Sequence, residues 1–184
     1  MSRYVERLKS LVALPEVSLP EVNWAEVERF LGVTLPSDYK EFMETYGPGA
    51  FDDEIILVDP RSASEDSHLL DLWKREVDAF LFLKGKVSTP FWISDPERTL
   101  LPWAYTPNSD AFFWLMDPVE DPDQWPVVLR DEEFEWFYFP GSMTRFLVSV
   151  LSGDIYSELD EIDPEFFVNL SPVGQSYFSP GDTV

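Results

Sequence analysis

The 184-residue chain contains no cysteine. It therefore cannot form a disulfide, a thiolate nucleophile or a cysteine-ligated metal site. No apolar run reaches the length of a membrane span, and the charged, amphipathic N-terminus lacks the apolar stretch of a secretory signal. These absences predict a cytoplasmic protein that does not enter a membrane.

Basic residues are scarce as well. Thirteen Lys and Arg residues face 35 Asp and Glu residues, which gives a formal net charge of −22. Nucleic-acid-binding proteins need Lys and Arg to displace phosphate counterions, and anionic membrane surfaces repel an acidic protein. We therefore expect neither nucleic acid nor a membrane as a partner. An acidic field attracts a cation or a basic protein, although acidity can also serve solubility alone.

Groups suited to proton transfer near neutral pH are also few, because His68 is the single histidine. It lies three residues from Glu65 and from Asp71 on the polar side of a predicted helix, which is typical of a surface histidine. The sequence has no nucleophile elbow, phosphate-binding loop or dinucleotide fingerprint. Carboxylates near Asp117 lack the glycine and the distant glutamate of an EF-hand loop. We expect no catalytic residue, cofactor or metal site, and a hydrolase that uses two carboxylates is the least favoured alternative.

Aromatic residues, by contrast, make up 16% of the chain, and 45% of it is hydrophobic, so a folded core is expected despite the charge. Apolar spacing predicts helices at 3–13, between Asn23 and Gly32, between Leu35 and Gly47, across 64–83 and before Gly153. Strands are predicted at 55–58, 91–93, 100–105, 111–116, 125–129 and 135–139.

This order of elements predicts an α+β fold. We expect a single domain with an antiparallel β-meander of about five or six strands, packed with N-terminal helices and a closing C-terminal helix. The expected boundaries are a helix and linker at 1–19, the domain at 20–153 and an acidic extension at 154–184. Because the extension is acidic and then rich in Pro, Gly and Ser, we expect it to be loosely held.

The chain resembles the SUKH (Smi/Knr-like) superfamily in its N-terminal signature, Trp24-x-x-Val27-Glu28-x-x-Leu31-Gly32-x-x-Leu35-Pro36-x-Asp38-Tyr39-Lys40-x-Phe42-x-x-x-Tyr46-Gly47. The family's central hairpin is similar to Leu100-Leu101-Pro102-Trp103-Ala104 and Asn108-Ser109-Asp110, with Ser109 in place of the usual glycine. The signature residues are interpreted as mainly structural: Trp24, Gly32, Leu35, Pro36, Tyr39, Phe42, Gly47, Pro102, Trp103, Asn108 and Asp110.

The resemblance implies a non-catalytic binding role. Bacterial members of the superfamily look like immunity proteins that neutralise toxins, and fungal relatives regulate cell-wall synthesis. On this basis the chain is interpreted as an immunity protein that binds a toxin domain, and the negative charge indicates that this toxin is basic. The alternative is an intracellular regulatory scaffold like the fungal relatives.

Two acidic stretches are candidates for the partner-binding surface. The candidate residues of the first stretch are Asp117, Glu120, Asp121, Asp123, Asp131, Glu132, Glu133, Glu135 and, as an aromatic anchor, Trp136. The second stretch runs from Asp154 to Glu165 and contains no base. Alternation along 134–139 places aromatic residues on both faces, which indicates either a strand covered on two sides or an exposed aromatic patch.

Overall fold

The computed structural model describes residues 2–60, 62, 68–83, 86–90, 93, 99–118, 120–159, 162–163 and 165–181. Three helices open the chain: α1 (Arg3–Leu11), α2 (Trp24–Leu31) and α3 (Ser37–Thr45). The predicted caps of α2 are confirmed. The side chain of Asn23 accepts a hydrogen bond from the backbone N–H of Glu26, and Gly32 ends the helix in a left-handed conformation with φ 72°.

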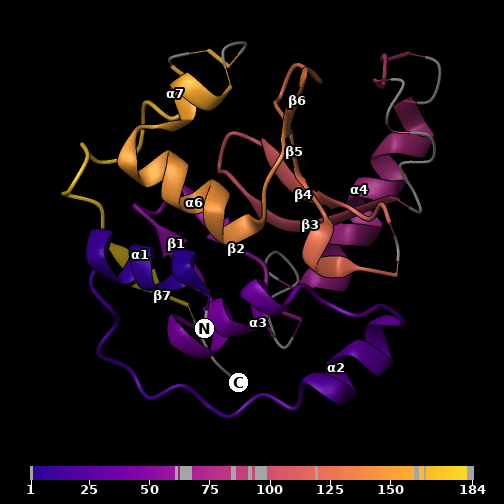
Figure 1. Ribbon diagram of the computed structural model, residues 1–184. Coiled ribbons are helices and arrows are strands. Elements are labelled where there is room, and N and C mark those ends of the chain that lie inside the picture. Colours follow the sequence, from indigo (N-terminus) through magenta and orange to yellow (C-terminus); the bar gives the residue numbers. More distant parts are fainter. Residues whose placement is uncertain are drawn as a thin grey trace.

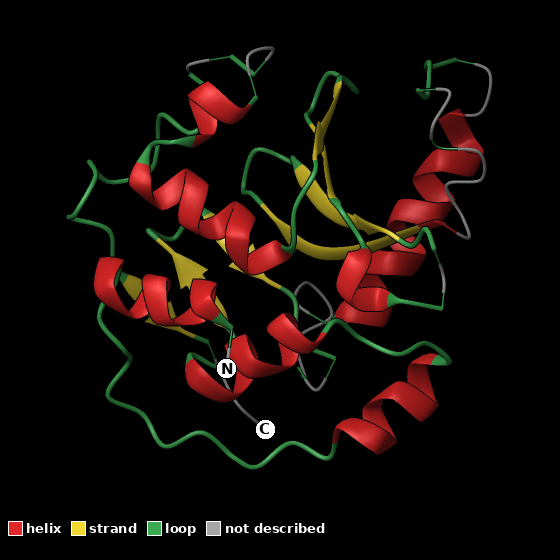
Figure 2. Ribbon diagram, in the orientation of Figure 1, coloured by secondary structure: helices red, strands yellow, loops and turns green. Residues whose placement is uncertain are grey.

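A seven-stranded antiparallel sheet forms the centre of the fold (Figures 1 and 2). Its strands are β1 (Gly49–Phe51), β2 (Ile55–Leu57), β3 (Leu100–Tyr105), β4 (Ala111–Leu115), β5 (Val127–Arg130), β6 (Trp136–Phe139) and β7 (Phe178–Pro180). The spatial order is β6-β5-β4-β3-β2-β1-β7. The first six strands therefore follow one another as a meander, and β7 joins its β1 edge.

Both faces of the sheet are covered. On one face lie α1, α3 and α6 (Met143–Ser152), while α4 (Leu69–Leu83) packs against β3 on the other, as Figure 2 shows. The alternation of β4 explains why all five of its residues are buried. Phe112 and Trp114 belong to the large core beneath α6, and Phe113 belongs to a smaller core with Phe80 of α4.

The predicted α+β meander is confirmed, and the strand count is slightly higher than expected. β1 and β7 are three residues long and contain Gly49 and Pro180, so they are too short to show a periodic pattern. The central hairpin forms as predicted, and Ser109 adopts φ 75°, the left-handed conformation that glycine favours. Of the strand predicted at 91–93, Phe91 and Trp92 lie outside the described residues.

The expectation of a loosely held C-terminal segment is wrong. After α6 the chain forms α7 (Ile155–Glu158), buries Phe167 in the large core and returns to pair β7 with β1. Asp52 in the β1–β2 turn accepts backbone hydrogen bonds from Ser171 (3.1 Å) and Tyr177 (3.0 Å). Phe178 also holds this segment to β1, because its ring centroid lies 5.0 Å from that of Phe51.

Candidate functional site

The signature aromatics serve the core. Tyr39 is fully buried and donates its hydroxyl hydrogen to the carbonyl of Val58 at 2.7 Å. Its ring makes edge contacts with Trp24, at 6.0 Å between centroids, and with Trp114, at 5.1 Å. The indole Nε1–H of Trp24 donates to Glu44 at 2.6 Å. These contacts hold α2 against α3 and α3 against the sheet, so these rings have a structural role.

The remaining signature residues cap elements, fill the core or shape the central hairpin. Pro36 is the N-cap of α3, and Gly47 follows this helix with φ 76°. Asp110 accepts a hydrogen bond from the hydroxyl of Thr106 at 2.6 Å and so closes the β3–β4 turn, in which Asn108 is exposed. The large core contains Leu35, Phe42 and Trp103. The pairing of β3 with β4 is irregular next to Pro102.

The first acidic stretch does not form one surface. In an antiparallel meander, alternate connections lie at the same end of the sheet, so the connections before and after β5 lie at opposite ends. Asp117 to Asp123 occupy the loop between β4 and β5, which we call the loop end. Asp131 to Glu135 form the β5–β6 turn at the opposite end, which we call the turn end. Figure 1 shows this turn at the tip of the β5–β6 hairpin, away from α3.

Two of the predicted binding residues have local structural roles. The carboxylate of Asp123 accepts the backbone N–H of Ser37 at 2.6 Å and thereby caps the first turn of α3 across 86 residues. Asp131 accepts the N–H of Glu135 at 2.7 Å inside the β5–β6 turn. The other acidic candidates are exposed: Asp117, Glu120 and Asp121 at the loop end, and Glu132, Glu133 and Glu135 at the turn end.

The turn end gathers further acids. The β1–β2 turn (52–54) and the β3–β4 turn (106–110) lie at this end too, because they precede even-numbered strands as the β5–β6 turn does. The described end of the second acidic stretch, Glu165, is near it, since the ring of the next residue, Phe166, is 5.9 Å from that of Phe137 in β6. The turn end is therefore closer to Glu165 than the sequence suggests, while the loop end is at the opposite end of the sheet.

Arg130, the one base of the first stretch, is not part of the acidic surface. Its side chain is 7% exposed, and its Nη2 lies 3.0 Å from Oε2 of Glu76, which is 11% exposed. The guanidinium lies 4.6 Å from the centroid of the Phe134 ring, and Phe134 has a left-handed φ of 66°. Burial raises the pKa of Glu76, and the charges of Arg130 and Arg75 partly oppose this shift.

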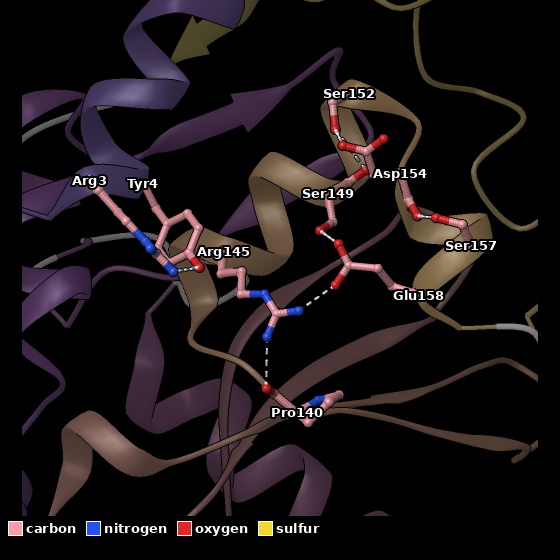
Figure 3. A network of polar contacts seen from close by, with 9 residues as sticks. All are labelled: Arg3, Tyr4, Pro140, Arg145, Ser149, Ser152, Asp154, Ser157 and Glu158. Atoms are coloured by element: carbon pink, nitrogen blue, oxygen red, sulfur yellow. Dashed lines mark hydrogen bonds and ion pairs between the residues drawn. The ribbon is translucent and has the colours of Figure 1, made fainter.

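The second base after residue 98 is also neutralised inside the protein. Arg145 of α6 donates to the carbonyl of Pro140 at 3.0 Å and to Glu158 at 2.6 Å, as Figure 3 shows. Glu158 accepts a further hydrogen bond, at 2.6 Å, from the hydroxyl of Ser149. The guanidinium also lies over the ring of Phe139, at 5.0 Å from its centroid. This network fixes α7 to α6 and pairs the charge of Arg145 with a carboxylate at the surface.

Trp136 lies under α4 rather than on an open surface. Its ring stacks on Phe80 with centroids 5.7 Å apart and also contacts Phe113 at 6.0 Å. Phe137 and Phe139 are buried on the opposite face, and Tyr138 is 43% exposed. Of the two interpretations of this strand, the structure thus supports coverage on two sides for most of its length.

A pocket of about 470 Å³ opens at the turn end, between α4, the β3–β4 turn and the β5–β6 turn. It is lined by Arg75, Glu76, Tyr105, Thr106, Pro107, Ser109, Asp110, Arg130, Glu132 and Phe134. No signal in the sequence marks this pocket, because its walls come from segments that are joined only by the folding of the sheet.

The chemistry of an enzyme or metal site is not evident in the described residues. His68 lies 3.2 Å from Asp71 and does not line the turn-end pocket. Among these residues, no three His, Asp or Glu side chains are grouped so that they could hold a metal ion. No described helix is both long enough and apolar enough to span a membrane.

Comparison with known proteins identifies the family. Residues 21–142, about two-thirds of the chain, match SUKH_6, the SMI1-KNR4 cell-wall family. The chain therefore belongs to the SMI1-KNR4 (SUKH) family, as its signature predicts. No curated protein and no solved structure matches it significantly. The matched range spans α2 and α3, which carry the N-terminal signature, the central hairpin and both acidic segments of the first stretch.

Proposed function

We propose that this protein is a non-catalytic, cytoplasmic immunity protein that binds and neutralises a basic toxin domain. The observation that supports the proposal is the separation of charge along the chain. Residues 99–184 contain sixteen acidic side chains and two basic ones, Arg130 and Arg145. Both arginines are paired with carboxylates within the fold, at 3.0 Å and 2.6 Å. The surface from this half of the chain therefore carries almost uncompensated negative charge.

Such a surface suits rapid capture of a basic partner. Complementary charge raises association rate constants to about 10⁸–10⁹ M⁻¹s⁻¹ at low salt. An immunity protein benefits from speed, because it must bind its toxin before damage occurs. The exposed carboxylates of Glu132, Glu133 and Glu135 lie on a turn held by a rigid hairpin, so their position costs little ordering on binding.

The first test is affinity capture from a lysate of the native host at low and high salt, with identification of the bound proteins. We expect one dominant basic protein that salt releases. When the captured protein is expressed alone it should inhibit growth, and co-expression of the immunity protein should restore growth. A captured partner that is harmless to cells, or growth that is not restored, would overturn the immunity function.

Two matched variants locate the surface. One carries Lys at Glu132, Glu133 and Glu135, and the other carries Lys at the loop-end residues Asp117, Glu120 and Asp121. Both change the net charge equally, and both spare Asp123, which caps α3. We expect the turn-end variant to lower the association rate constant about tenfold at low salt, and the loop-end variant to lower it about threefold at most. Equal effects would mean that the whole field, and no particular surface, attracts the partner.

The second candidate is a regulatory scaffold. The family description refers to SMI1-KNR4 cell-wall proteins, and this favours a regulatory role in the cell. In that case the capture experiment would recover several partners with modest affinity, none of them toxic. The two functions are therefore separated by the same measurement.

A further inference from the structure

The turn-end pocket has room for a long side chain, and its lining combines apolar and charged residues. Its volume of about 470 Å³ lies within the range of about 300–1,000 Å³ that is usual for ligand pockets. Its apolar lining includes the rings of Tyr105, Pro107 and Phe134. Such rings can cover the methylene stem of a lysine or arginine, whose charged group then extends to a polar wall.

The polar wall is acidic. The carboxylates of Glu76, Asp110 and Glu132 line the pocket together with the guanidinium groups of Arg75 and Arg130, which leaves a formal charge of −1. Arg130 already has partners within the fold. Its Nη2 lies 3.0 Å from Oε2 of Glu76, and its guanidinium lies 4.6 Å from the centroid of the Phe134 ring. Arg75, on the exposed surface of α4, lies 5.9 Å from the centroid of the Tyr105 ring.

Glu76 contributes a buried carboxylate to this wall. The residue is 8% exposed, and its Oε2 is held by the ion pair with Arg130 at 3.0 Å. In the low-dielectric interior, the negative potential of such carboxylates is only partly screened. This potential, in a chain of net charge −22, favours a cation over an anion as the occupant.

We infer that the turn-end pocket binds one arginine or lysine side chain of the basic partner and is the anchor point of the complex. The inference rests on the proposed function for the source of that side chain. Arginine is enriched among the few interface residues that carry most of the binding energy, and such residues fill pockets near the centre of an interface. The carboxylates of Glu133 and Glu135, which lie on the same turn, would then form part of the rim.

The test uses the full chain and a small probe. Argininamide is titrated into ¹⁵N-labelled protein, with citrullinamide, which has the same α-amine and a neutral isosteric side chain, as the control. We expect saturable shifts of the backbone amides in the 106–110 and 131–135 turns with argininamide and none with citrullinamide. Shifts spread evenly over the loop end as well, or equal shifts with both probes, would overturn the inference, because they would indicate a general counterion effect or binding without charge recognition.

A matched pair of variants sharpens the test. Glu132 lines the pocket and its neighbour Glu133 does not, although both are exposed. We expect Glu132→Gln to weaken argininamide binding about three- to fivefold, as one partly exposed ion pair would, and Glu133→Gln to change it less than twofold. Equal effects of the two substitutions would refute the binding of argininamide in the pocket. Thermal melting checks that both variants fold.

The two proposals can fail separately. Binding of argininamide without any toxic partner in the host would support the pocket as a binding site and refute the immunity function. A toxin that dissociates at the same rate from the Glu132→Gln and Glu133→Gln variants would support the immunity function and refute the pocket as the anchor point of the complex.

Discussion

Replacing Arg130 with methionine should destabilise the protein strongly at neutral pH. The substitution keeps an unbranched apolar stem and removes the cation that faces Glu76 at 3.0 Å. Glu76 is then a buried carboxylate whose remaining nearby cation is Arg75, on the exposed surface of α4. Removing one partner of a buried ion pair costs about 3–5 kcal/mol, and we expect a loss of this size.

The loss should depend on pH in a defined direction. Burial already raises the pKa of Glu76, and without Arg130 the pKa rises further. A carboxyl group whose pKa is higher in the folded state binds its proton more tightly there, so stability falls as pH rises from the unfolded to the folded pKa. The deficit of the Arg130→Met variant should therefore be largest at neutral pH, shrink as pH falls toward about 4.3, the ordinary value for glutamate, and be smallest below it.

Urea denaturation followed by tryptophan fluorescence measures these losses, since the chain has seven tryptophans. The double variant with Glu76→Leu should recover most of the stability, because it removes the buried charge as well. Arg145→Met is the control: its ion pair with Glu158 is about a third exposed, so we expect a loss of about 1 kcal/mol. A loss below 1 kcal/mol for Arg130→Met, or a double variant as unstable as the single one, would refute the reasoning.

Two further predictions concern the aromatic core. Burial raises the pKa of Tyr46 to about 12, so the unfolded chain ionises first and stability falls by about 2–3 kcal/mol as pH rises from about 10 to 12. Tyr46→Phe should remove that part of the alkaline loss, and urea midpoints that fall equally in both proteins would contradict it. Phe178→Ala should cost about 3–5 kcal/mol in global stability and expose the β1 amides to hydrogen exchange, because Phe178 packs on Phe42, Tyr46 and Phe51. A loss confined to exchange at the C-terminus would show that the segment opens by itself.

The sequence predicts what is decided by neighbouring residues. Asn23 and Gly32 cap α2 as expected, because capping depends on residues within one turn of each other. The strands predicted at 100–105 and 111–116 match β3 and β4 to within one residue, because they are long enough to show strong strand preference. The three-residue strands β1 and β7 carry no such signal, and their pairing is fixed by distant partners.

Long-range polar contacts escape prediction for the same reason. The carboxylate of Asp38 accepts hydrogen bonds from the N–H and the hydroxyl of Thr144, 106 residues later, and so caps α6 from another helix. Asp123 does the same for α3. In the sequence these residues are ordinary acids of an acidic chain, and nothing distinguishes them from exposed ones.

The exposure of the candidate acids follows from the sequence, whereas their arrangement in space does not. The acids of 117–135 are mostly exposed, as a surface role requires. Their continuity in sequence suggested continuity in space, but β5 lies between Asp123 and Asp131 and carries them to opposite ends of the sheet. The pocket between α4 and two turns could not be predicted, because it depends on how three separate segments meet.

The position of β7 has a consequence for biosynthesis. The edge of β1 is closed by a strand whose neighbour, Tyr177, lies 125 residues after Asp52. At a translation rate of about 5–20 residues per second, β1 leaves the ribosome several seconds before its partner exists. During that interval an unpaired strand edge, the kind of surface that joins other chains, stays open on the nascent protein. Ribosome-bound chains that stop before Phe178 should therefore be the form of this protein most prone to aggregate.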